Sequence, residues 1–195
     1  MTVPVLPVSL VKSVARSLAA TVAVTQSPFT GSRQVQDWGG EWWQYDIEMA
    51  LLQGRNGQRL SAFLAQMGGA RGTFLFTDPS IRNTVIGASP LVNGAGQSGN
   101  SLVTDGWGAT GLKAGDFFSL GADSSTRLYQ VTADVAPTAG AATIQFVPRL
   151  RSAPADNAPL TVVAPQVLLS LTAPVPVQIY GADKYTVRFS AREAI

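Results

Sequence analysis

Apolar and polar residues alternate with a period of two over much of this chain, and glycine-containing turns separate the alternating stretches. This pattern is typical of β-strands that bury one face. The composition points the same way. The 195 residues include 19 Gly and 12 Pro, and only 13% are charged, against about 25% in an average soluble domain. The sequence therefore predicts a mainly β protein with short strands and tight turns.

One segment, Arg55–Met67, has a helical period instead. Its apolar residues follow the spacing i, i+3, i+4 and i+7: Leu60, Phe63, Leu64 and Met67. Asn56 is the expected N-cap, and Gly68–Gly69 is the expected left-handed end of the helix. We expect one α-helix with one buried face.

The N-terminal third predicts two or three strands. Thr21–Thr25 alternates, and Pro28–Gly31 has the composition of a turn. Gln34–Trp38 and Glu41–Met49 also alternate, and Gly39-Gly40 between them suggests the turn of a hairpin. In the second stretch one face is apolar: Trp43, Tyr45, Ile47 and Met49.

The rest of the chain indicates a domain interrupted by a second one. Further strands are expected at 72–77, 116–120, 127–135, 142–147, 167–171 and 185–190. The composition changes near Ala88, where Asn93–Gly99 is rich in glycine, and longer strands return after Pro165. We therefore expect one discontinuous domain, residues 1–87 and 166–195, and an inserted domain, residues 88–165, that forms a closed or nearly closed small barrel.

The composition also excludes several kinds of chemistry. The chain has no Cys and no His, which excludes disulfides, Cys or His zinc sites, Cys nucleophiles and Ser-His-Asp triads. The net charge is only +2, without a run of Lys or Arg, so nucleic-acid specificity is not expected. The apolar stretch Ser17–Val24 is far shorter than the ~20 residues of a membrane-spanning helix, so we expect no membrane insertion.

Two further patterns could suggest a catalytic or phosphate-binding site. Four carboxylates recur about every ten residues, at expected strand ends or turns: Asp105, Asp116, Asp123 and Asp134. An Asp in a turn usually caps its own backbone. The glycines of Asn93–Gly99 precede no helical period and no Lys-Ser/Thr pair, as a phosphate-binding loop requires. We expect no enzymatic activity, no cofactor and no metal.

Aromatic residues are densest around Trp38, Trp42, Trp43 and Tyr45. Their rings could line a sugar-binding groove, or they could fill a sandwich core and a subunit contact. The sequence leaves both interpretations open. Trp38, Trp42, Trp43 and Trp107 are the candidate interface or ligand-contact residues.

Several of these segments together resemble the distal tail proteins of long-tailed (siphovirus-like) bacteriophages and prophages. The likeness in the discontinuous domain lies in Gln34–Trp38 with Trp42-Trp43, Leu60–Leu64, Gly72–Pro79 and the closing strand Tyr185–Ser190. The likeness to that family's inserted barrel lies in Leu112–Phe118, Arg127–Ala133 and Ala142–Arg151. It extends over nearly the whole chain.

The resemblance implies a β-sandwich "belt" domain with one helix, assembled into a homohexameric ring, and an inserted OB-like β-barrel on the outside of the ring. The chain would be a structural virion protein of the tail tip, made in the host bacterial cytoplasm. Its partners would be the tail tube protein and the tail-tip hub or baseplate proteins. The family offers no catalytic residues to carry over.

Two alternatives remain. One is a carbohydrate- or receptor-binding tail-tip module, in which Trp38, Trp42, Trp107 or the barrel contacts host surface glycan. The other is a tail-tube or terminator ring protein. Tube proteins commonly expose a long hairpin, and the sequence pattern offers no clear candidate for one.

Overall fold

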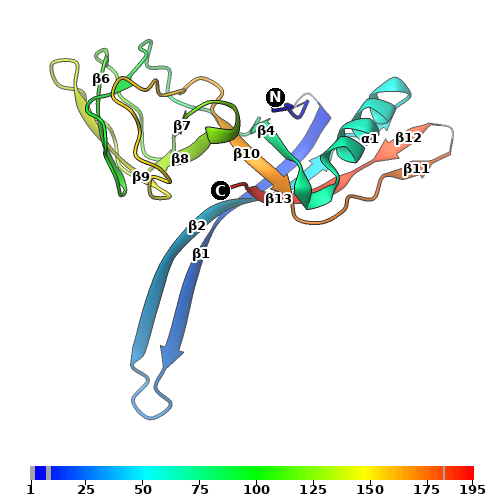
Figure 1. Ribbon diagram of the computed structural model, residues 1–195, viewed down its shortest axis with the longest axis horizontal. Helices are drawn as coiled ribbons and strands as arrows, with labels where there is room; N and C mark the ends of the chain where they lie inside the picture. The colour runs from blue at the N-terminus through cyan, green and yellow to red at the C-terminus, as the bar shows by residue number, and fades with distance from the viewer. Residues whose placement is uncertain (1–2, 8–9, 182) are drawn as a thin grey trace.

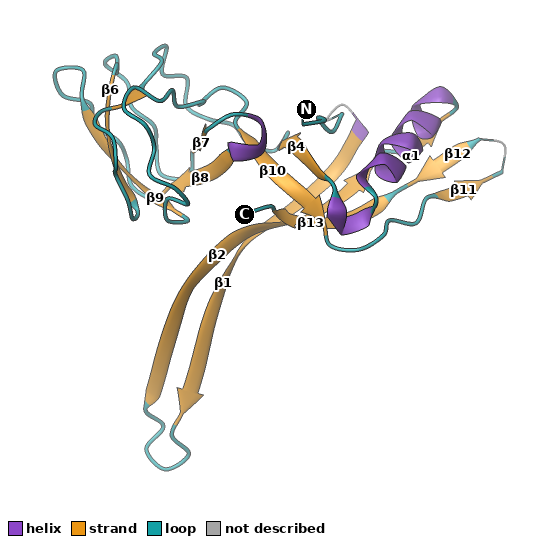
Figure 2. Cartoon of the chain, viewed as in Figure 1, coloured by secondary structure: helices purple, strands orange, loops and turns teal. Residues whose placement is uncertain are grey.

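The computed structural model of the chain describes residues 3–7, 10–181 and 183–195. The fold is mainly β, and α1 (Arg55–Met67) is the only α-helix in these residues (Figures 1 and 2). Two short 3₁₀ helices follow it, η2 (Gly69–Arg71) and η3 (Asp123–Ser125). The predicted fold class is confirmed.

Two antiparallel sheets belong to the belt, our name for the described residues within 1–87 and 166–195. The larger has the order β1 (Val11–Gln26), β2 (Arg33–Met49), β13 (Arg188–Glu193), β10 (Gln166–Leu171) and β4 (Thr73–Thr77). The smaller has the order β11 (Gln178–Tyr180), β12 (Lys184–Thr186) and β3 (Leu52–Gln53). The expected single strand at 185–190 is thus divided between the two sheets at Val187.

The belt core lies between the large sheet on one side and α1 with the small sheet on the other. As the alternation predicts, β2 contributes four buried side chains: Trp43, Tyr45, Ile47 and Met49. The helix contributes Leu60, Leu64 and Met67 to the same core, while Phe63 packs at its margin. The period-two and period-3.6 patterns therefore meet on one apolar interior.

The two ends of α1 differ in how well the sequence predicts them. Gly68 adopts the expected left-handed conformation (φ 60°), and its N–H donates to the Ala65 carbonyl at 3.2 Å. The N-cap is Gly54 rather than Asn56, and no side chain caps the helix there.

The barrel, residues 88–165, is a curled five-stranded sheet. Its order is β5 (Leu91–Val92), β6 (Ser101–Asp105), β9 (Ala142–Val147), β8 (Arg127–Val131) and β7 (Phe117–Leu120). The segment 157–161 connects its two edge strands. Asn157 N–H donates to the Val92 carbonyl at 2.9 Å, and Thr161 exchanges backbone hydrogen bonds with Ser119, each 2.9 Å. The expected nearly closed barrel is therefore present.

Each part has its own hydrophobic cluster, but the division is not complete. The barrel cluster runs from Ile86 to Val162. Phe117 and Leu128, both from barrel strands, are instead buried in the belt core. Side chains of the barrel therefore pack into the belt core. The two domain boundaries remain a prediction.

The structure corrects the prediction at Gly39-Gly40. We expected a turn, but β2 runs through both glycines, and β1 and β2 form one long hairpin. The register passes from Ala20 opposite Glu41 to Val22 opposite Asp37, so Thr21 alone faces residues 38–40. The glycines therefore form a β-bulge, which bends a hairpin instead of ending a strand. The long hairpin that the sequence did not suggest is the most prominent projection of the molecule (Figure 1).

The packing of α1 on the small sheet can be tested at Gly57. A Cβ there would overlap the ring of Tyr185, which lies against the helix. Gly57→Ala gains about 1 kcal/mol of helix propensity, but the overlap costs about 1–3 kcal/mol. We expect a net loss of unfolding free energy in urea denaturation. Gly108→Ala, whose Cβ would have ordinary contacts of 3.8 Å or more, should be close to neutral. Stabilisation by Gly57→Ala would contradict the packing.

Candidate functional site

The hairpin has three parts, which we name the root (residues 11–20 with 41–49), the bulge (Thr21 opposite 38–40) and the arm (residues 22–37). The root belongs to the belt sheet, because β13 pairs with β2 from Gln44 to Glu48. Every residue of the arm except Ser27 is exposed. The arm therefore gains almost nothing from the belt core, and a two-stranded ribbon by itself is marginally stable in water.

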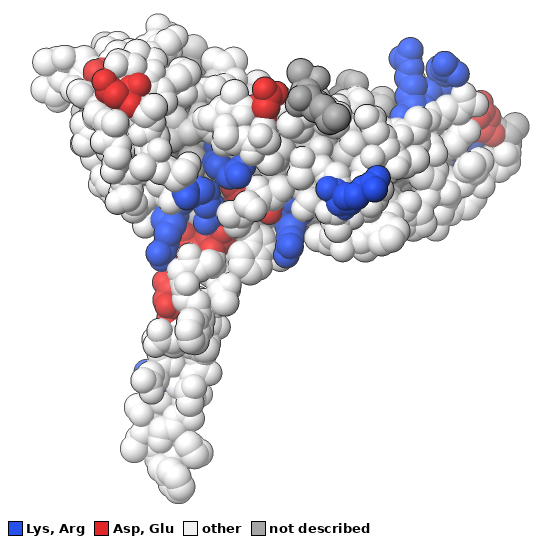
Figure 3. Space-filling view, viewed as in Figure 1, with Lys and Arg blue, Asp and Glu red and all other residues white. Residues whose placement is uncertain are grey.

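The surface of the arm is apolar for a structure in water. Val24 and Val35 are direct cross-strand partners and are 52% and 50% exposed. Val22, on the same face, is 43% exposed. The arm has two charged residues, Arg33 near the tip and Asp37 beside the bulge. In the space-filling view the arm is almost free of charged side chains, whereas its root is surrounded by them (Figure 3).

Both long edges of the arm lack a strand partner within the described chain. β1 is an edge strand over its whole length, and β2 pairs with β13 only in the root. Open edges with exposed valines invite pairing with another chain, and monomeric proteins normally protect such edges with charge or proline. The arm therefore has the properties of an interface.

The tip of the arm is an ordered turn that presents one aromatic ring. Ser27 Oγ accepts hydrogen bonds from the N–H groups of Phe29 and Thr30, both 3.3 Å. Gly31 closes the turn with φ 69°, and its N–H donates to the Ser27 carbonyl at 2.9 Å. Phe29 is 95% exposed at this tip.

The root is fixed by a partly buried ion pair. Arg16 on β1 pairs with Asp78, which follows β4 and is 3% exposed. The guanidinium carbon lies 4.1 Å from the centroid of the Phe117 ring and 5.9 Å from that of Trp43. One side chain thus connects the root, the belt and the barrel, with favourable cation–π contacts.

Two arginines of the loop after β9 connect the barrel to the root and the bulge. Arg151 donates to the Glu41 carbonyl on β2 and, at 3.1 Å, to Glu193. Arg149 donates its backbone N–H to Glu41 Oε2 at 3.0 Å, and its guanidinium lies 3.9 Å from Asp37. We call these five residues the clasp.

Glu193 is the buried member of the clasp, at 2% exposure. Its Oε2 also accepts the backbone N–H of Trp43 at 3.3 Å. Burial raises the pKa of the Glu193 carboxyl above its ordinary value, while the nearby Arg151 and the Trp43 N–H act in the opposite direction.

The four tryptophans do not form a common groove. Trp43 and Trp107 are 3% and 6% exposed, and their indole N–H groups donate to the Leu128 carbonyl (2.9 Å) and Thr104 Oγ1 (2.8 Å). Core packing accounts for both. Trp42 is half-buried, and its indole nitrogen has no hydrogen-bond partner among the described residues. Trp38, in the bulge, is 68% exposed and is the one ring of the four that is freely accessible.

Two of the four recurring aspartates, Asp116 and Asp134, have structural partners. Asp116 is buried and accepts the N–H groups of Lys113 (2.8 Å) and Thr84 (3.2 Å). Asp134 accepts the N–H of Ala114 at 2.9 Å, which, with the Lys113 ammonium, lowers the pKa of its carboxyl. Within residues 3–7, 10–181 and 183–195, no three acidic groups lie close enough together to bind a metal ion.

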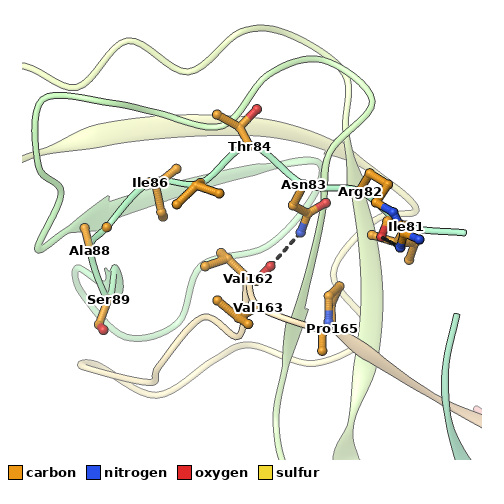
Figure 4. A pocket seen from close by; sticks show the side chains of 13 residues that line it. Ile81, Arg82, Asn83, Thr84, Ile86, Ala88, Ser89, Val162, Val163 and Pro165 are labelled. Carbon is orange, nitrogen blue, oxygen red and sulfur yellow. Dashed lines mark hydrogen bonds between the residues drawn. The ribbon is translucent and has the colours of Figure 1, made fainter. Parts of the chain in front are cut away.

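A groove of about 420 Å³ lies where the two connecting segments pass between belt and barrel (Figure 4). Val85 and Val163 on its rim are 90% and 83% exposed. Asn83 fixes its floor: the amide nitrogen donates to the Phe117 and Val162 carbonyls, both 2.6 Å, and the amide oxygen accepts the Phe117 N–H at 2.8 Å. The groove contains no acid, and its one arginine, Arg82, donates to carbonyls of its own segment. The Asn83 hydrogen bonds thus join the two connecting segments to the barrel strand that contains Phe117.

Comparison with protein-family models and with curated proteins finds no match for this chain. In the part of the chain that the structure describes, no helix has the length and apolar character needed to cross a bilayer. The arm is therefore the candidate functional site on its geometry alone.

The anchoring of the root is tested by Arg16→Ala, which leaves Asp78 buried without its partner. Breaking a buried pair in this way costs about 3–5 kcal/mol of unfolding free energy. Lys12→Ala is the matched control on the same strand, because the Lys12–Glu48 pair is exposed (side chains 63% and 39%), so water screens it and its loss should change the stability little. Equal losses in denaturant unfolding would show that Arg16 does not anchor the root.

The protonation of Glu193 is tested by the pH dependence of stability. A raised pKa means that the folded state holds this proton more tightly than the unfolded chain does. The contribution of Glu193 to the free energy of unfolding should therefore fall as the pH rises above the ordinary Glu value of 4.5, up to the folded-state pKa. Glu193→Gln cannot ionise, so the wild-type value minus the variant value should decrease over that range. A difference that stays constant or grows would contradict this account of the site.

Proposed function

We propose that this chain is a structural virion protein that forms a homohexameric ring at the distal end of a phage tail and joins the tail tube protein to the tail-tip hub. The residues that resemble distal tail proteins support the proposal. The observation that carries it is the arm, an exposed apolar ribbon with two open edges.

The edges of the arm suggest how a ring could close. The open edge of β1 and the open edge of β2 are different surfaces on opposite sides of one ribbon. Pairing of one edge with the other edge of the next copy is a heterologous contact, and such contacts generate rings when the rotation closes. β-strand addition of this kind supplies main-chain hydrogen bonds at both edges. It would also place side chains of the added strands beside Val24 and Val35 on the face of the ribbon.

The same arm favours a second candidate, a tail-tube or terminator ring protein. The sequence pattern offered no long hairpin, which counted against this role, and the presence of the arm removes that argument. Electron microscopy distinguishes the two candidates. A tail-tip protein should form single rings, whereas a tube protein should stack into cylinders.

A glycan-binding module is the remaining alternative. Of its candidate residues, Trp38 is exposed and Trp107 is buried. If the protein is a monomer in solution, a glycan-binding assay should compare the wild type with Trp38→Ala. Loss of binding in that variant would favour this alternative over the ring.

The ring is tested by the mass of the purified protein in light scattering and native mass spectrometry. We expect about six times the chain mass of 20.4 kDa. Val24→Lys places a charge on the arm surface and should reduce the hexamer to smaller species. Val103→Lys is the matched control, because Val103 is 44% exposed on barrel strand β6, away from the arm.

A hexamer that tolerates Val24→Lys as well as Val103→Lys would rule out the arm as the ring contact. A monomer at high protein concentration would contradict ring formation by the chain alone.

A further inference from the structure

We propose that the barrel sets the direction of the arm through Arg149, and that the arm swings about the Gly39-Gly40 bulge when this contact is lost. The proposal concerns the single chain and does not depend on the ring. It rests on the bulge, on the fixed position of the root, and on the few contacts that extend beyond the bulge.

The bulge is the point at which the hairpin can bend. Thr21 faces three residues of β2 there, so the regular ladder of cross-strand pairs is interrupted. Gly39 has φ 71°, a backbone conformation that residues other than glycine rarely adopt. Gly40 lies against Thr21, whose Oγ1 would be 2.8 Å from a Cβ at Gly40. Figure 1 shows β1 and β2 curving away from the belt together.

The root side of the bulge is fixed independently of Arg149. Arg151, whose side chain is 10% exposed, binds the Glu41 carbonyl and the buried Glu193. Arg16 binds Asp78 in the belt. A change at the bulge therefore moves the arm and leaves the root in place.

Arg149 is the clasp residue that reaches past the bulge. Its guanidinium lies over Gly39, with Nη1 2.8 Å from the position of a Cβ there. Its Nη2 lies 3.9 Å from Oδ2 of Asp37, the arm residue of β2 that is next to the bulge. Among the hydrogen bonds and ion pairs of the described residues, this pair alone connects the arm to the barrel.

The contact is weak enough to be released. The side chains of Arg149 and Asp37 are 47% and 59% exposed, so water and salt screen their attraction. The backbone N–H of Arg149 still binds Glu41 when the guanidinium moves, so the loop keeps its attachment to the root. The arm angle thus depends on an ion pair that a change in ionic conditions can open.

Single-molecule Förster resonance energy transfer measures the distance from the arm tip to α1, and this distance changes when the arm swings. The chain has no cysteine, so dyes can be attached specifically at Phe29→Cys on the tip and Ala62→Cys on the exposed face of α1. Picomolar concentrations keep the chain monomeric, which separates this test from ring formation. The comparison is between the wild type, Arg149→Ala and Lys113→Ala. The last variant removes an exposed ion pair on the surface of the barrel, between Lys113 and Asp134 at 3.1 Å.

We expect one narrow distance distribution for the wild type and for Lys113→Ala, and a shifted or broadened distribution for Arg149→Ala. Asp37→Asn removes the same contact from the arm side and should reproduce the change. Salt at about 1 M, where the Debye length is about 3 Å, should broaden the wild-type distribution. If Arg149→Ala and Asp37→Asn both give the distribution of Lys113→Ala, Arg149 does not hold the arm and the proposal is wrong.

Discussion

The position of the root, from which the arm projects, depends on one ion pair between a partly buried arginine and a buried aspartate. Arg16 lies on β1 at the root, and its guanidinium binds Asp78 of the belt while it covers the Phe117 ring of the barrel. Burying both charges is costly, and the cost is offset only where the geometry and the surroundings suit the pair. Here the aromatic rings of Phe117 and Trp43 supply a favourable face for the cation. Three parts of the molecule that are distant in sequence are thereby held in one arrangement.

The parts of the molecule differ in how much apolar surface they bury. The belt and the barrel each bury a hydrophobic cluster, and Phe117 and Leu128 extend from one into the other. The arm has neither a core nor a covering element, and its valines and Phe29 face water. A folded body that projects such a ribbon leaves open edges that a second chain can complete. The proposal that the chain is an assembly subunit rests on this contrast.

The sequence predicted the elements whose signal is local. The apolar face of Trp43, Tyr45, Ile47 and Met49 is buried as expected, and the Arg55–Met67 helix ends at Gly68. The arm was missed because its signal depends on pairing: Gly39-Gly40 has the composition of a turn, and only the register with β1 shows that it is a bulge. The roles of Arg16, Arg149 and Glu193 also could not be predicted, because each binds residues at least 42 positions away in the sequence or on another sheet. The sequence also could not show that Trp43 is buried and Trp38 exposed. Alternation predicts the face of the strand on which a side chain lies, but it does not show where along the strand the belt core ends.

Hydrogen exchange of the arm, measured at low and at high protein concentration, tests the central claim most directly. The outer N–H groups of β1 and β2 in residues 22–37 have no partner strand among the described residues, and they should exchange rapidly when the protein is dilute. If the arm is the assembly surface, these amides become protected as the protein associates, while the amides of α1 keep the same exchange rates. Association that protects other surfaces and leaves residues 22–37 in rapid exchange would contradict the account.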